Sequence, residues 1–191
     1  MKLLIAYGST EGQTQKIAEN LAAHIRRRGL DVTVYDADRR TRDIQIDTFD
    51  AIIVASPVHQ KLHHTSIRDF VIAHRRLLEI KPSAFISVSL SAAVPGGVLH
   101  AQEYVDHFIE TTGWRPETYI MVAGAVRLAE YDFFKEQILR HVVFKDRPAD
   151  TLLGRDHEFT DWDALHEFTD RFVDQLGARM TSGSISKPDG T

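Results

Sequence analysis

A glycine- and hydroxyl-rich loop near the amino terminus, residues 8–14, most constrains how this chain can fold. It follows an apolar run at residues 3–7 and precedes a segment in which Ile17, Leu21 and Ile25 recur at helical spacing. A strand therefore leads through a short loop into a helix. The first amides of a helix have no partners within it, and the helix dipole places partial positive charge there. Because glycine also lets a ligand approach the backbone, the loop predicts a phosphate site that needs no lysine.

The spacing within this loop excludes two common phosphate-binding motifs. A Walker A loop requires a lysine after its second glycine, but Gln13 follows Gly12 here. A dinucleotide fingerprint requires Gly-x-Gly-x-x-Gly, whereas three residues separate Gly8 from Gly12. An ordinary helix start, capped by Ser9 or Thr10, is the alternative to a phosphate loop.

Composition limits the classes of protein to consider. The chain has 191 residues, enough for one domain with a substantial core. It has no cysteine, which excludes disulfides, thiolate catalysis and thiolate-bound metal sites, and which fits a reducing cytoplasm. The formal net charge of −4 does not favour nucleic-acid binding. We expect a single domain over residues 1–180 and a disordered, polar tail over residues 181–191.

Strand-like and helix-like segments alternate along the chain. The β-branched run at residues 51–55 is typical of a central parallel strand that is buried on both faces. Thr160 is expected to cap the last helix. The alternation predicts an α/β fold with an open, doubly wound, five-stranded parallel sheet. We expect strands at residues 2–7, 31–35, 51–55, 83–90 and 118–125, and helices at residues 13–28, 65–79, 99–112, 131–143 and 160–176.

Ligands of such sheets bind at the carboxyl ends of the strands. Four loops are therefore candidates for a binding site, at residues 8–14, 56–64, 91–98 and 126–131.

The first of these loops resembles the Ser/Thr-x-Thr-Gly-x-Thr loop that wraps the FMN phosphate in flavodoxins. It reads Ser9-Thr10-Glu11-Gly12-Gln13-Thr14, with Glu11 where that family often has threonine. Other segments resemble one branch of the family, the menaquinone-dependent protoporphyrinogen dehydrogenases, and the resemblance covers roughly residues 2–175. These segments are Ala55-Ser56-Pro57-Val58-His59, residues 83–90, Thr112-Gly113-Trp114-Arg115-Pro116, Ala123-Gly124-Ala125-Val126-Arg127 and Phe159-Thr160-Asp161-Trp162.

The resemblance implies a flavodoxin-like strand order, 2-1-3-4-5, and FMN as cofactor. It also implies oxidation of protoporphyrinogen IX to protoporphyrin IX, with electrons passed to a quinone. Arg127 and Tyr131 would lie near the substrate, although Tyr131 fits the start of a helix equally well. The implied cofactor contacts are Ser9, Thr10, Glu11, Gly12, Gln13, Thr14, Pro57, Val58, His59, Gln60, Lys61, Ser91, Ala92 and Ala93.

The loop after the third strand supplies candidate catalytic groups. His59 and His63 are candidate proton acceptors because imidazole titrates near neutral pH. Lys61 would stabilise negative charge on a reduced flavin. With His64, the two histidines also suggest a metal site, but no carboxylate or cysteine stands nearby in the sequence, so we expect no metal. A solvated, histidine-rich loop is the alternative.

Other functions stay open from the sequence. An electron carrier of the flavodoxin type is one, although carriers tend to be strongly acidic and this chain combines its −4 charge with 23 lysines and arginines. A flavin-dependent quinone or nitro reductase that takes hydride from NAD(P)H is another. A phosphoacceptor receiver domain would need acidic residues where Tyr7, Gly8 and Ser9 stand. A quinone partner implies transient membrane contact by a cytoplasmic protein, and a homodimer is left open.

Overall fold

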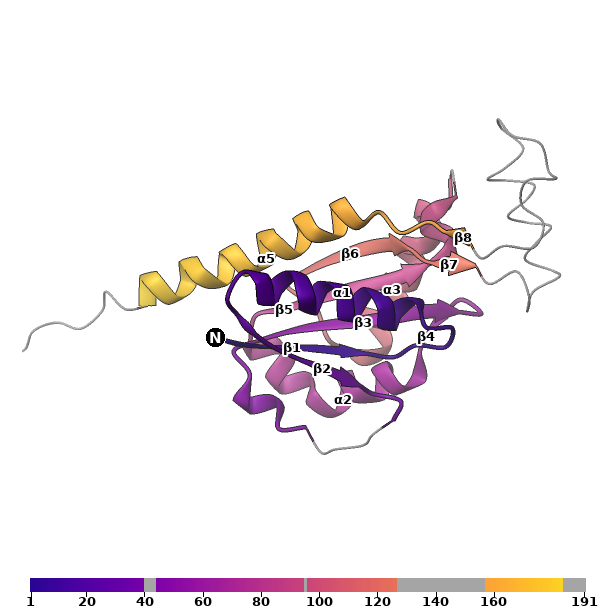
Figure 1. The fold of residues 1–191 in the computed structure, drawn as a ribbon. Helices are drawn as coiled ribbons and strands as arrows, with labels where there is room; N and C mark the ends of the chain where they lie inside the picture. Colours follow the sequence, from indigo (N-terminus) through magenta and orange to yellow (C-terminus); the bar gives the residue numbers. More distant parts are fainter. Residues whose placement is uncertain (40–43, 95, 127–156, 184–191) are drawn as a thin grey trace, which may run out of the picture.

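A central parallel sheet with helices on both faces forms the molecule (Figure 1). The computed structural model describes residues 1–39, 44–94, 96–126 and 157–183. The strands are β1 Lys2–Tyr7, β2 Asp31–Asp36, β3 Ala51–His59, β4 Leu62–His63, β5 Ser83–Ser89, β6 Thr118–Ala123, β7 Ala125–Val126 and β8 His157–Glu158. The helices are α1 Gln13–Arg27, α2 Thr65–Ile80, α3 Val98–Thr112 and α5 Trp162–Gly183, with short 3₁₀ helices η1 Ile46–Thr48 and η2 Leu90–Ala93.

The order of the sheet is β2-β1-β3-β5-β6, and each of these neighbouring pairs is parallel. Counted over the parallel strands alone, this is the expected order 2-1-3-4-5, so the α/β doubly wound fold is confirmed. The order reverses direction beside β1, between β1 and β3. The carboxyl ends of these two strands therefore border the crevice in which such sheets bind ligands.

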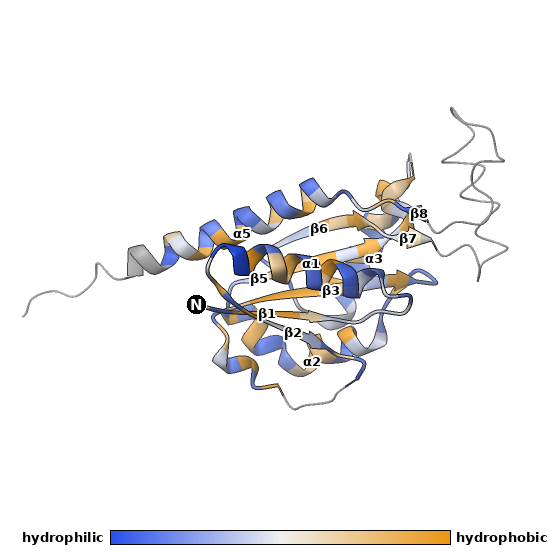
Figure 2. Cartoon of the chain, in the orientation of Figure 1, coloured by the Kyte–Doolittle hydropathy of each residue, from blue (hydrophilic) through white to orange (hydrophobic). Residues whose placement is uncertain are grey.

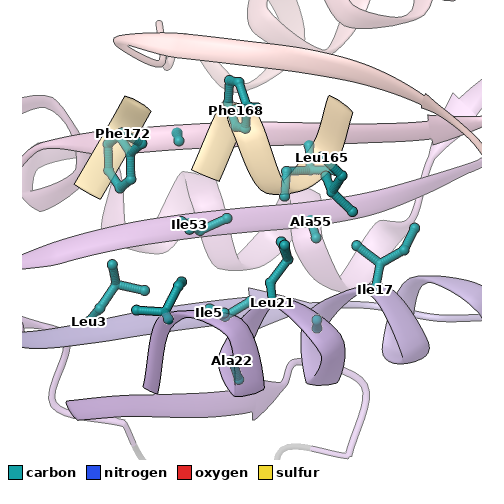
Figure 3. Packing of buried hydrophobic residues seen from close by; sticks show 14 of the residues in the cluster. Leu3, Ile5, Ile17, Leu21, Ala22, Ile53, Ala55, Leu165, Phe168 and Phe172 are labelled. Atoms are coloured by element: carbon teal, nitrogen blue, oxygen red, sulfur yellow. The ribbon is translucent and has the colours of Figure 1, made fainter. Parts of the chain in front are cut away.

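Alternation along the strands sends side chains into two cores. In β1, Leu3 and Ile5 face the layer of α1 and α5, whereas Leu4 and Ala6 face the layer of α2 and α3. Figure 3 shows the first core, where Ile17 and Leu21 of α1 meet side chains of the sheet and of α5. Figure 2 shows the same division along the chain, with hydrophobic strands inside and helices that alternate between polar and apolar residues.

Three short strands were not expected. β3 continues past residue 55 to His59 and turns back through β4, so residues 58–63 form an antiparallel hairpin rather than an irregular loop. The last parallel strand ends at Ala123, and β7 pairs instead with β8. The helix expected at residues 131–143 lies outside the described residues.

The last helix begins differently from the expectation. Asp161, not Thr160, caps α5, because its carboxylate accepts the backbone N–H of Ala164 at 3.0 Å. Thr160 instead donates its hydroxyl to the carbonyl of Ala123 at 2.8 Å. α5 also continues to Gly183, beyond residue 180, where the tail was expected to begin.

His63 is buried in the second core rather than exposed on a loop. Its ring packs edge-on against Phe85 and Phe108, with centroids 5.1 and 4.8 Å away, and only 9% of the residue is exposed. Nε2 lies 3.4 Å from the hydroxyl of Ser87. Burial of the ring lowers the pKa of His63 to about 3, so the imidazole is neutral near pH 7.

This buried neutral ring makes the protein sensitive to acid. Between pH 6.5 and about 3 the unfolded chain binds a proton at His63 that the folded chain does not, so the stability that this neutral ring provides is lost as the pH falls. The slope from one such group is at most about 1.4 kcal/mol per pH unit. We expect His63→Phe to flatten the dependence of unfolding free energy on pH in this window, as measured by urea denaturation. If the unfolding free energies of wild type and variant depend on pH in the same way, His63 is not the cause of the acid sensitivity, because all other histidines are present in both proteins.

Candidate functional site

A cavity of about 610 Å³ lies at the carboxyl edge of the sheet. Its volume falls in the range of small-molecule and cofactor sites, about 300–1,000 Å³. It brings together segments that are distant in the sequence: the β1–α1 loop, the β3–β4 hairpin, the end of β5 with η2, the first turns of α3, and the β6–β7 junction. The lining residues are Ser9, Thr10, Glu11, Gln13, Thr14, Pro57, Val58, His59, Gln60, Lys61, Val88, Ser89, Leu90, Ser91, His100, Glu103, Tyr104, Gly124 and Ala125.

The β1–α1 loop presents the start of α1 to this cavity. Gly12 is the N-cap residue of α1 and has a φ of 88°, which is in the left-handed region that glycine adopts without strain. The N–H of Gly12 donates to the hydroxyl of Ser9 at 3.0 Å. Thr14, in the first turn, is 1% exposed and lines the cavity. The loop therefore combines helix amides and hydroxyls at one end of the cavity, as an anion site requires.

Contacts with α2 and β2 hold the loop in place. A Cβ on Gly8 would lie 2.9 Å from the Ser66 hydroxyl and 3.2 Å from Nδ1 of His64, so the loop backbone packs directly against the start of α2. Asp38, which follows β2, accepts the N–H of Ser9 at 3.1 Å and lies 3.3 Å from Nδ1 of His64. The position of the loop is thus fixed from two sides.

A tether from the carboxyl-terminal part of the chain holds the first turn of α1. Nε2 of Gln13 donates to Oε1 of Glu158 at 3.0 Å and to the Thr160 hydroxyl at 2.8 Å. Nζ of Lys16 lies 2.5 Å from the same carboxylate. Burial opposes ionisation of Glu158, but the hydrogen bonds from Lys16 and Gln13 outweigh it and lower the pKa of this carboxyl. Both amide hydrogens of Gln13 are therefore engaged away from any ligand.

The β3–β4 hairpin forms a second wall of the cavity. Its two turn residues, Gln60 and Lys61, have φ values of 50° and 68°, as in a type I′ turn. Non-glycine residues seldom adopt this conformation, and they hold it where the surrounding structure enforces it. The turn places Lys61 and His59 at the cavity, whereas His63 points to the core. The structure thus brings His59 to the site as expected but does not bring His63 there.

The segment after β5 contributes less than expected. Ser91 lines the cavity, but Ala92 and Ala93 do not. They form η2, in which the N–H of Ala92 donates to the hydroxyl of Ser89 at 3.3 Å. Gly12 also contributes no lining atoms, although its neighbours do. Arg127 and Tyr131 lie outside the described residues.

The first turns of α3 supply lining residues that the sequence reasoning missed, His100, Glu103 and Tyr104. Nδ1 of His100 lies 3.1 Å from Oε2 of Glu103, and the Tyr104 hydroxyl lies 3.4 Å from that of Ser91. The available signal was positional: a helix that starts directly after the fourth parallel strand begins at the ligand edge, so its residues at i, i+3 and i+4 face the same region.

The described ranges, 1–39, 44–94, 96–126 and 157–183, contain no group of three histidine and acidic side chains placed to hold a metal ion. Nor do they contain a helix long and apolar enough to cross a membrane.

Comparison with known proteins identifies related chains. Residues 4–151 match the family model described as a flavodoxin domain. The chain is 27% identical over 169 residues to the protoporphyrinogen IX dehydrogenase [quinone] of Escherichia coli, covering 88% of this chain and 92% of that one. It is 24% identical over 197 residues to the protein of the same name from Leishmania major, covering 99% of this chain and 83% of that one.

Among solved structures, the fold is similar to oxidised flavodoxin 1 from Bacillus cereus, with a TM-score of 0.56 and 17% identity over 91% of this chain and 98% of that chain. The family model covers most of the chain. The chain therefore belongs to the flavodoxin domain family.

Proposed function

We propose that this chain is an FMN-dependent oxidoreductase that oxidises protoporphyrinogen IX to protoporphyrin IX and passes the electrons to a quinone. The observation that supports this most is the cavity at the carboxyl edge of the sheet, which begins at a loop suited to phosphate. Relatives that match over most of the chain carry the name of this activity.

The residues at the cavity fit FMN. The hydroxyls of Ser9, Thr10 and Thr14, with the amides of Thr10 and Thr14, would hold the phosphate at the start of α1, where the dipole favours an anion. Gly8 leaves no room for a Cβ, so the loop is packed in the shape that presents these donors. Pro57, Val58, His59, Gln60, Lys61 and Ser91 would line the rest of the flavin, with Glu11 and Gln13 beside its phosphate.

Bound flavin would supply the two-electron redox chemistry. The chain's own contribution is to bind, orient and neutralise charge. Lys61 at the turn of the β3–β4 hairpin would stabilise negative charge at the cavity. His59 is a candidate to accept a proton there. A membrane quinone would require transient contact with a lipid surface, which stays a prediction, as does a homodimer.

An electron carrier is the second candidate, favoured by the similarity of the fold to a flavodoxin. A carrier needs an exposed flavin edge and a docking surface, usually a strongly acidic one. The modest net charge of −4 and a third cavity wall made by α3 favour an enzyme with its own small-molecule substrate instead. An NAD(P)H-dependent quinone reductase is a further alternative.

Anaerobic turnover separates these functions. We expect the FMN-loaded protein to convert protoporphyrinogen IX to protoporphyrin IX when a menaquinone analogue is present, followed by the fluorescence of the product. The flavin should not bleach rapidly with NADH. No porphyrin product, together with reversible one-electron reduction by a flavodoxin reductase, would instead support the carrier. Rapid bleaching by NADH would support the reductase.

Thr14 tests the phosphate end of the site. Thr14→Val keeps the shape of a side chain that is 1% exposed but removes its hydroxyl. We expect FMN binding to weaken by about 1–3 kcal/mol, because a buried phosphate oxygen loses a donor. Flavin fluorescence quenching gives the dissociation constant. Thr169→Val is the matched control, since Thr169 is 0% exposed and lies in α5, outside the cavity. Equal dissociation constants for wild type and Thr14→Val would contradict the assigned phosphate loop.

A further inference from the structure

The α3 wall of the cavity carries a histidine–carboxylate pair. His100 and Glu103 lie three residues apart on the first turns of α3, and both line the cavity. Nδ1 of His100 lies 3.1 Å from Oε2 of Glu103. Their side chains are 66% and 69% exposed, so the pair borders both the cavity and solvent. As a surface pair it would stabilise α3 by only a few tenths of a kcal/mol, which is a small role for two groups placed at a ligand site.

The contact fixes which ring nitrogen carries the proton. An ionised carboxylate only accepts hydrogen bonds, so Nδ1 of His100 must be the donor in this contact. In the neutral imidazole Nδ1 then holds the hydrogen and Nε2 carries the free lone pair. Free histidine in water prefers the opposite tautomer, with the hydrogen on Nε2. Glu103 therefore sets His100 in the form that accepts a proton at Nε2, and it would stabilise the imidazolium that results.

Tyr104, next to Glu103 in the sequence, helps to hold the start of α3 against the edge of the sheet. The hydroxyl of Tyr104 lies 3.4 Å from that of Ser91, which follows β5 and also lines the cavity. Gly97, just before α3, packs so closely on the carbonyl of Ser91 that a Cβ there would lie 2.2 Å from it. The start of α3 is thus held against the segment that borders the site, and His100 with it.

We propose that His100 is the proton acceptor of the oxidation and that Glu103 is its positioning residue; this assignment rests on the function proposed above. Each two-electron oxidation of a porphyrinogen removes one hydride equivalent from a bridging carbon and one proton. Over the three oxidations four hydrogens leave bridging carbons and two leave pyrrole nitrogens. Bound flavin would supply the acceptor for the electron pair, and a quinone would be the final oxidant. The proton passes to Nε2 of His100, and the exposure of this side chain lets it leave to water.

This places the proton acceptor on a helix that sequence reasoning did not single out. His63 is excluded by its position in the core, between Phe85 and Phe108. His59 lines the cavity as His100 does, so the two histidines must be separated by experiment. His59→Gln is therefore the comparison that separates the two cavity histidines.

Nitrogen NMR of the FMN-loaded, isotopically labelled protein reads the tautomer directly, independently of activity. The signal of His100 is assigned by its loss in His100→Gln. We expect wild-type His100 to be protonated at Nδ1, and Glu103→Ala to return it to the Nε2-protonated form. A wild-type His100 that is protonated at Nε2 would overturn the assignment, whether or not the protein turns over.

Single-turnover bleaching of the bound flavin by protoporphyrinogen under anaerobic conditions tests the chemical role. We expect His100→Gln to slow bleaching by about 100-fold, as loss of a general base does. Glu103→Ala should slow it by about 10-fold, the worth of a charge-assisted hydrogen bond. His107→Gln, which changes an exposed histidine further along α3 and outside the cavity, should match wild type. All three variants should bind FMN with the wild-type dissociation constant.

Two failures are distinguishable. If wild type binds FMN but never bleaches with protoporphyrinogen, the proposed function is wrong, and the role of His100 in it falls with it. If wild type bleaches and His100→Gln bleaches as fast as His107→Gln, the function stands and His100 is not the acceptor. If only His59→Gln slows bleaching, the proton acceptor is His59 of the β3–β4 hairpin and not His100.

Discussion

The close packing of the β1–α1 loop on the start of α2 is the constraint on which the site depends. Gly8 leaves no space for a side chain beside Ser66 and His64, so the loop backbone is pressed against another helix. Asp38 joins the same two parts by accepting the N–H of Ser9 and approaching Nδ1 of His64. An anion site made of amides works only if those amides are held in place before the ligand arrives. Here two neighbouring elements do so without any cation in the loop.

The carboxyl-terminal part of the chain completes this arrangement. Glu158 and Thr160 take both amide hydrogens of Gln13, and Thr160 also bonds to the end of β6. The first turn of α1 is therefore connected to β6, the edge strand of the sheet, which lies far from α1 in the sequence. The connection explains why Thr160 does not cap α5: its hydroxyl is already engaged, and Asp161 takes the cap.

The sequence was sufficient for the fold because its strongest signals are local. Apolar runs at residues 3–7 and 51–55, and helical spacing at Ile17, Leu21 and Ile25, report one strand or helix each. The hairpin was missed because Gln60-Lys61 is not one of the asparagine–glycine pairs that mark a type I′ turn. His63 was named as a candidate proton acceptor because residues 56–64 were expected to form an irregular loop. In a hairpin, alternation sends His59 and His63 to different surroundings, whereas in an irregular loop both would be available.

The residues of α3 were missed for a different reason. His100, Glu103 and Tyr104 carry no motif, and their relation to the loop at Ser9 exists only once the sheet has brought them to one edge. The composition of the loop at residues 8–14 marks it as a candidate site in the sequence, whereas only position after the fourth parallel strand points to the α3 wall.

Comparison of FMN with riboflavin measures the central claim most directly, because the two differ only in the phosphate. If the loop at residues 8–14 seats a phosphate through several charge-assisted hydrogen bonds, FMN should bind at least about 100-fold more tightly than riboflavin in a titration of the full chain. Equal dissociation constants for the two flavins would show that the loop holds no phosphate, and the site would have to be assigned anew.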